Sequence, residues 1–166
     1  MDAAARAELA RMLSTPPSSG DAAGAAAGVL LVSIKPCYAQ LIEVGFKRVE
    51  FRKRVPATVR PGTEVVFYVS APVQAVQLRA RVAAVCRAEP AALWRKVGQF
   101  AGTPKRDFDA YFSGFERGVG LVLEQVERID PAVKVARLRG VGFAPPQSLR
   151  VIRAGDPAYG MVARHA

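Results

Sequence analysis

The densest polar chemistry in this chain lies between Gly45 and Arg54, where one glutamate stands among cationic side chains. In an extended strand successive side chains point to opposite faces, so Val49 and Phe51 would share an apolar face. Glu50 and Arg52 would lie on the opposite, charged face. The run alone leaves two interpretations open. It is either the solvated face of an ordinary strand, since surface ion pairs are common, or a cluster of charges presented to a charged partner.

Glu50 can play two parts in such a cluster. It can pair with the flanking cations and hold them in position for a ligand, or it can take part in proton transfer. We expect Lys47 at the start of the strand, with its alkyl stem buried and its ammonium reaching outward. Glu50 would then lie between Lys47 and Arg52. Cations on both sides stabilise a charged carboxylate, which favours the orienting role over that of a general acid.

The sequence contains few of the residues that other catalytic arrangements require. The only histidine, His165, stands next to the end of the sequence, so we expect neither a Ser–His–Asp triad nor a histidine-dependent ribonuclease mechanism. The two cysteines, Cys37 and Cys86, match neither a disulfide framework nor the spacing of metal ligands. We therefore predict no metal and no cofactor. A desolvated lysine could still act as a base, and Lys35 and Lys47 are the candidates.

The overall charge points to polyanionic partners. The 166 residues include 24 lysines and arginines against 14 aspartates and glutamates, which gives a net charge of +10. Arginine outnumbers lysine, and its planar guanidinium suits phosphate groups and base edges. A general bias toward arginine in the genome would give the same composition. The chain has no apolar run near the roughly 18 residues that a membrane helix needs and does not open like a secretory signal, so we expect a cytoplasmic protein that does not bind membranes.

Apolar runs and turn residues predict one domain with five or six strands and short helices between them. Strand and long helix do not alternate regularly, which favours a small mixed or barrel-like sheet over a doubly wound one. We expect a disordered or loosely helical extension at 1–28, the domain at 29–153 and a tail at 154–166. The expected strands are 29–34, 45–54, 64–70, 73–87 and 118–129, with a last element over 134–152, and the expected helices are 37–44, 91–100 and one that starts at Pro104 with Thr103 as its cap.

Several short motifs in this order are similar to those of the ASCH domain, the activating-signal-cointegrator homology group of the PUA-like superfamily. The central motif, Gly45-x-Lys47-x-x-Glu50-x-Arg52, matches the G-x-K-x-x-E-x-R signature of that family. The resemblance covers about residues 29 to 152. The other motifs are Ser33-Ile34-Lys35-Pro36 with Tyr38, Tyr68-x-Ser70-x-Pro72, Leu93-Trp94, Phe108-x-x-Tyr111-Phe112 and Pro145-Pro146-Gln147-Ser148-x-Arg150.

The resemblance implies an α+β fold, a small PUA-like mixed β-barrel with helical insertions, whose signature residues line a cleft beside the helices. Families of this superfamily bind RNA or modified nucleobases, and some ASCH proteins are enzymes. One cleaves RNA, and a shorter branch hydrolyses the amide of acetylated cytidine. That branch has a threonine nucleophile where this chain has Glu50, and a carboxylate cannot supply the hydroxyl. The resemblance therefore does not carry this activity over.

We expect a nucleic-acid-binding module, for RNA or single strands, built around this motif. Lys35, Lys47 and Arg52 would hold phosphate or a base edge, and Glu50 would orient them or accept a hydrogen bond from a nucleobase. Tyr111 or Tyr68 could stack on a base, although packing in the core is the commoner role for both. The rim would be formed by Ser70, Gln147, Ser148 and Arg150.

Two alternatives stay open. The first is an enzyme that acts on RNA or a modified nucleoside, a ribonuclease or nucleoside amidohydrolase, with Lys47 and Glu50 as a proton-transfer pair. The second is a regulatory adaptor that uses its basic face on an acidic protein. A nucleotide-like small molecule could also occupy the cleft. The sequence gives no indication of the oligomeric state.

Overall fold

The structure, a computed structural model, describes residues 7, 9–11 and 28–163. Most of the extension expected at 1–28, and His165, lie outside the described residues. The few described residues near the N-terminus are helical, and Leu9 among them is buried against the folded domain. No helix within the described part of the chain is long and apolar enough to cross a membrane. The cytoplasmic location and the domain limits at 29 and 153 stay predictions.

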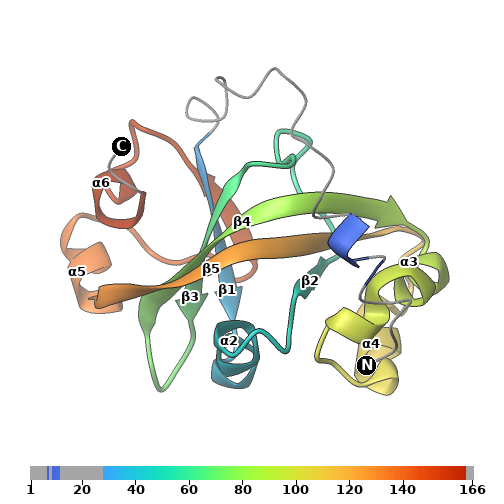
Figure 1. The fold of residues 1–166 in the computed structure, drawn as a ribbon. Helices are drawn as coiled ribbons and strands as arrows, with labels where there is room; N and C mark the ends of the chain where they lie inside the picture. The colour runs from blue at the N-terminus through green and yellow to red at the C-terminus, as the bar shows by residue number, and fades with distance from the viewer. Residues whose placement is uncertain (1–6, 8, 12–27, 164–166) are drawn as a thin grey trace.

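A mixed sheet of six strands, in the order β2-β5-β4-β3-β1-β6, forms the framework (Figure 1). β1 and β3 are parallel, and every other neighbouring pair is antiparallel. β4 and β5 run side by side across the whole molecule. The strands are β1 (Val29–Ile34), β2 (Val49–Arg52), β3 (Glu64–Val69), β4 (Ala75–Ala88), β5 (Gly118–Lys134) and β6 (Leu149–Ile152).

Breaks in the strand register bend this sheet. Pairing shifts once between β3 and β4, at Phe67/Tyr68, and at three places between β4 and β5. A bulge of this kind bends its strand and increases the local twist. The sheet therefore curls into a half-barrel, which confirms the predicted PUA-like mixed sheet with helical insertions. β2 and β6 form its two edges.

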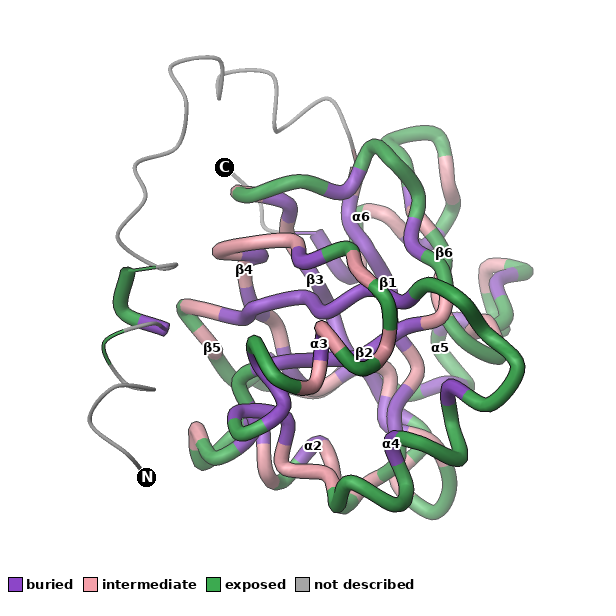
Figure 2. The backbone as a smooth tube through the Cα atoms, turned by 90° about the vertical axis from the view of Figure 1, so that its right-hand side faces the viewer, coloured by how far each residue is buried: buried purple, intermediate pink, exposed green. Residues whose placement is uncertain are grey.

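The concave side of the sheet holds the first apolar cluster. Alternate residues of each strand point into it, for example Leu30, Val32 and Ile34 of β1, as strand alternation requires. α2 (Pro36–Glu43) lies against this side and contributes Ala39 and Ile42. Figure 2 shows the buried segments running along the strands, with exposed backbone mainly in the connections. Because α2 begins only two residues after β1 ends, it packs close to the end of that strand.

The other helices form two groups at opposite ends of the long strands (Figure 1). α3 (Pro90–Val97), η3 (Gly98–Phe100) and α4 (Lys105–Phe112) lie at one end and bury an aromatic-rich second cluster against β2 and β5. α5 (Val135–Gly140) and α6 (Tyr159–Val162) lie at the other end over a third cluster. Part of the expected tail therefore packs on the sheet, because Ala158 and Val162 are buried there.

Three predicted elements differ from the structure. The strand expected over 45–54 covers only Val49–Arg52, because Gly45, with φ of +74°, and the turn after it come first. Thr103 does not cap α4: its hydroxyl donates to the Ala101 carbonyl at 3.3 Å, and Pro104 is the N-cap rather than the first helical residue. The element expected over 134–152 is the end of β5, then α5, a connection and β6.

Candidate functional site

Strand β2 separates its side chains as the alternation of the sequence predicts. Val49 and Phe51 pack into the second cluster beneath α3 and α4. Glu50 and Arg52 point to the opposite side. A tight turn after α2 places Lys47 beside them, since its N–H donates to the Leu41 carbonyl at 2.8 Å. Three charged groups from one short stretch therefore meet on one side of an edge strand.

These three groups form a buried ion network. Lys47 Nζ lies 3.1 Å from Glu50 Oε2, and Arg52 Nη2 lies 2.8 Å from Glu50 Oε1. Their exposed fractions are only 3%, 6% and 8% for Lys47, Glu50 and Arg52. The expected place of Glu50 between the two cations is confirmed. The solvated-strand interpretation is wrong, because burial removes these charges from bulk water.

The expected position of the Lys47 ammonium is also wrong. It does not reach outward but donates to the Ala101 carbonyl at 2.7 Å, just after η3. It also lies 5.1 Å from the centre of the Tyr38 ring, close enough for a cation–π interaction. The carbonyl replaces the water that an ammonium would otherwise need. Lys47 is therefore fixed by groups from α2 and from the segment after η3.

Arg52 connects the two edges of the half-barrel. Its Nη2 donates to the Ser33 carbonyl at the end of β1 at 2.8 Å, and its Nη1 donates to Ser148 Oγ, just before β6, at 3.3 Å. A backbone bond from Ser33 N–H to the Ser148 carbonyl, 2.8 Å long, ties these partners together. Arg52 Nε is buried and has no hydrogen-bond partner among the described residues. One donor of the guanidinium is therefore unused at the opening of the barrel.

A cleft of about 670 Å³ opens beside this network, between α2, β2 and α4. This volume falls within the usual range for ligand sites. The residues predicted for the site that line it are Lys35, Lys47, Glu50, Arg52, Ser70, Tyr111 and Gln147. The lining also includes Ser33, Ile34, Tyr38, Phe51, Thr103, Asp107, Phe108 and Ala110.

Three residues of the predicted set behave differently. Ser148 does not line the cleft, but its Oγ accepts a hydrogen bond from Arg52 Nη1. Arg150 lies away from the cleft, where its guanidinium pairs with Asp156 and lies 4.8 Å from the centre of the Phe143 ring. Tyr68 packs against the third cluster, as the core interpretation expects. The membership of Arg150 in a rim around the cleft is therefore wrong.

Tyr111 is a surface residue rather than a core one. It is 38% exposed, and its hydroxyl accepts a hydrogen bond from the Lys53 N–H at 3.3 Å. Sequence reasoning missed Asp107, which lines the cleft from the first turn of the same helix. Residues four apart lie on one face of a helix, so the spacing of Asp107 and Tyr111 could have identified it.

The cleft carries more positive than negative charge. Lys35, Lys47 and Arg52 line it together with the carboxylates of Glu50 and Asp107. Lys35 is exposed, and in the described part of the chain its side chain has no ion pair. Asp107 lies 3.4 Å from Arg106 Nε in an exposed pair. Lys35 is therefore the cleft cation most accessible to a ligand. Over residues 28–163 and the described N-terminal residues, no group of His, Cys, Asp and Glu is arranged to hold a metal ion.

Comparisons with known proteins point to one family. No family model matches the chain. An ASCH domain-containing ribonuclease from Zymomonas mobilis subsp. mobilis is 30% identical over 125 residues, which cover 74% of this chain and 83% of the relative. The crystal structure of ASCH from Zymomonas mobilis is similar at a TM-score of 0.73 and 25% identity, covering 83% of this chain and 98% of that one. A tyrosine-to-phenylalanine variant of the Zymomonas mobilis protein gives the same TM-score at 26% identity, covering 81% and 96%. The chain therefore belongs to the ASCH domain family.

Proposed function

We propose that this protein binds single-stranded RNA in the cleft between α2 and α4. The observation that carries the proposal is a cleft of about 670 Å³ lined by three cations and two tyrosines. Single strands are bound by positive grooves that follow the backbone and by aromatic rings on which bases stack. The naming of a relative as a ribonuclease favours RNA over other polyanions.

The residues of the cleft divide the work of binding between them. Lys35 is accessible and holds a phosphate as a point charge. Lys47 and Arg52 are fixed by buried contacts and contribute positive potential at the base of the cleft. Tyr38 and Tyr111 offer ring surfaces to a base. Ser70 and Gln147 supply neutral hydrogen-bonding groups at the border.

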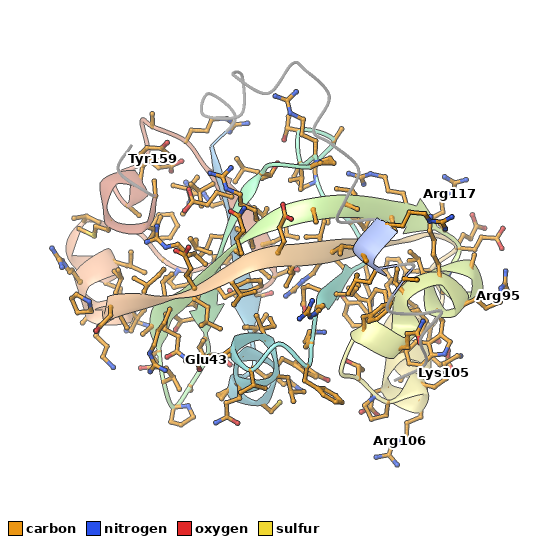
Figure 3. All side chains as sticks on the ribbon, in the orientation of Figure 1. Glu43, Arg95, Lys105, Arg106, Arg117 and Tyr159 are labelled. Atoms are coloured by element: carbon orange, nitrogen blue, oxygen red, sulfur yellow. The ribbon has the colours of Figure 1, made fainter. Side chains whose placement is uncertain are left out.

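Fluorescence anisotropy with a labelled single-stranded RNA tests binding at this site. Lys35→Ala removes about one phosphate contact, so the slope of log K against log salt becomes shallower by about 0.7. Arg95→Ala is the control, since Figure 3 shows Arg95 on the outer side of α3, pointing away from the body of the molecule. Equal slopes in both variants, or an affinity that does not change with salt, contradict the proposal. If the protein is instead an adaptor for an acidic protein, its affinity for RNA should not change with salt.

Cleavage of the bound RNA is a second candidate function, favoured by the relative named a ribonuclease. Both oxygens of Glu50 are engaged by cations, whereas Asp107 lines the cleft as an exposed carboxylate. The ribose 2′-oxygen forms a bond to the adjacent phosphorus and gives its proton to Asp107. The bond from phosphorus to the 5′-oxygen breaks, and that oxygen takes a proton from the Lys35 ammonium. The products are a 2′,3′-cyclic phosphate and a 5′-hydroxyl end.

The positive charge beside the cleft suits this reaction. Negative charge grows on the phosphate oxygens as the new bond forms, and fixed cations stabilise it in a site shielded from water. Lys47 and Arg52 are such cations, because the protein already holds both in place. Proton transfer by Lys47 and Glu50, the pair predicted from the sequence, stays a prediction. It would be supported if Glu50→Gln bound RNA normally but did not cleave it.

Asp107→Asn and Asp109→Asn form a matched pair for testing cleavage. Both aspartates lie on α4 and are exposed, but Asp109 pairs with Lys105 and does not line the cleft. A general base typically contributes 100-fold or more to a rate, so Asp107→Asn should lower the cleavage rate by about that factor while RNA binding persists. Asp109→Asn should cleave normally. An equal rate in both variants removes Asp107 from the reaction, and an oligomer without the 2′-hydroxyl should not be cut.

A further inference from the structure

The exposed large hydrophobic side chains belong to the two segments that flank the cleft, the turn between α2 and β2 and the end of α4 with the turn after it. Among the described residues, four large hydrophobic side chains are more than a third exposed: Val44 at 75%, Phe46 at 68%, Tyr111 at 38% and Phe115 at 36%. Single exposed hydrophobic residues need no explanation, but a group around one site indicates an interaction surface. These four residues come from two separate parts of the chain. The grouping is therefore a property of the folded surface rather than of one apolar stretch.

Phe46 marks the rim on the side of α2. It precedes Lys47, and both lie against Gly102, where an added Cβ would be 3.1 Å from Lys47 Cβ and 3.5 Å from Phe46 Cδ1. The next residue, Thr103, lines the cleft. Arg48, on the other side of Lys47, is exposed and donates from Nε to the Gly45 carbonyl at 3.2 Å. An exposed ring therefore lies beside the cleft next to an exposed cation.

Tyr111 and Phe115 mark the opposite rim, at the end of α4. Lys53 Nζ lies 4.1 Å from the centre of the Phe115 ring and 5.1 Å from that of Tyr111. The Lys53 N–H also donates to the Tyr111 hydroxyl, which links the end of β2 to this helix. The second rim thus repeats the pattern of the first, with exposed rings and a cation held next to them.

We propose that a strand of RNA crosses the cleft from one rim to the other and stacks one base on Phe46 and another on Tyr111 and Phe115. This inference rests on the proposed RNA binding and extends it from the cleft to the exposed rings on its two sides. Base stacking on aromatic rings tolerates any sequence, since every base has a flat face. Lys53 and Arg48 hold the phosphates of the stacked nucleotides. The rings mixed with cations favour a nucleic acid strand over an apolar protein segment.

RNA oligomers with a base removed test the path directly. Each oligomer keeps all its phosphates. One oligomer has an abasic nucleotide at one end, and a second oligomer has it at the other end. Phe46→Ala should bind the complete oligomer about five- to hundredfold more weakly than the wild type, with an unchanged salt slope. On an oligomer that lacks the base facing Phe46, Phe46→Ala and the wild type should bind equally. Phe115→Ala should behave in the same way for the opposite end.

Phe46→Tyr is the matched control, because it keeps a ring and should keep the affinity. Phe46 is mostly exposed, so its variants should fold, and an unchanged unfolding midpoint verifies this. A dinucleotide that fills only the cleft separates the two proposals: it should lose affinity in Lys35→Ala and not in Phe46→Ala. If the wild type binds RNA and the rim variants bind the complete oligomer equally well, only the path is wrong. If the wild type binds no RNA, both proposals fail. Loss of a protein partner in Phe46→Ala, with RNA binding intact, would assign the rim to a protein interface and overturn the path.

Discussion

Arg52 and Arg150 lie on the two edge strands of the same sheet, and each pairs with a carboxylate. Arg52 is buried and pairs with Glu50 of its own strand, and it also donates to Ser33 of β1 and to Ser148 just before β6, which are distant in the sequence. Arg150 is half-exposed and pairs with Asp156, only six residues further along. The first arginine joins the edges of the half-barrel beside a cleft, whereas the second forms a local pair on the surface.

The difference shows what makes an ion pair part of a site. An exposed pair is solvated and contributes little, about 0 to 1 kcal/mol. Charges taken out of water remain stable only when each is compensated, so their partners become fixed in position. The network around Arg52 meets that condition with Glu50 and two backbone carbonyls. The cleft therefore has a rigid charged base, which the surface around Arg150 lacks.

The largest effect expected from this comparison is on stability. Arg52→Ala removes the bridge between the edges, and breaking a buried pair costs about 3 to 5 kcal/mol of unfolding free energy. Arg150→Ala should cost about 1 kcal/mol or less. Urea unfolding of both variants measures the difference. Equal losses would show that burial does not distinguish the two arginines.

Arg52→Lys makes the comparison sharper because it keeps the charge. A lysine cannot reproduce the planar fork that reaches Glu50, the Ser33 carbonyl and Ser148 together. Losing one or two of these hydrogen bonds should cost about 1 to 3 kcal/mol, less than the alanine variant. Unfolding midpoints decide the order. A lysine variant as stable as the wild type would mean that charge alone, and not geometry, holds the edges together.

A smaller effect is expected on RNA affinity when Arg150 is replaced. Its side chain lies on the same face of β6 as Ile152, toward the third cluster and Phe143, and does not line the cleft. Arg150→Ala should therefore change affinity for single-stranded RNA less than Lys35→Ala at the same salt concentration. Anisotropy titrations compare the two. A larger loss in Arg150→Ala would place the RNA on the other side of the sheet.

Local patterns predicted the site where strand alternation controls it. The alternation of β2 separates Val49 and Phe51 from Glu50 and Arg52 without any knowledge of the fold. The same rule, applied to β6, excludes Arg150 from the rim. Leu149 and Val151 contact the first apolar cluster, and Arg150 points to the opposite face. The motif that ends in Arg150 predicts a place at the rim, whereas the alternation of β6 predicts the opposite face.

Contacts between distant residues account for what the sequence did not predict. The Lys47 ammonium is turned inward by the Ala101 carbonyl, 54 positions away. The Thr103 hydroxyl donates a hydrogen bond to that same carbonyl and therefore does not cap α4. Phe46 and Phe115 became candidates only when the fold placed them beside the cleft, since an isolated phenylalanine usually indicates a core position.

Photo-crosslinking of a thiouridine-containing single-stranded RNA, followed by mass spectrometry of the attached peptides, tests whether RNA occupies the cleft between α2 and α4. Crosslinks should form on the residues that line the cleft, above all Tyr38 and Tyr111, and fewer of them should form in Lys35→Ala. Crosslinks confined to the α5–α6 end, near Phe143 and Arg150, would contradict RNA binding in the cleft.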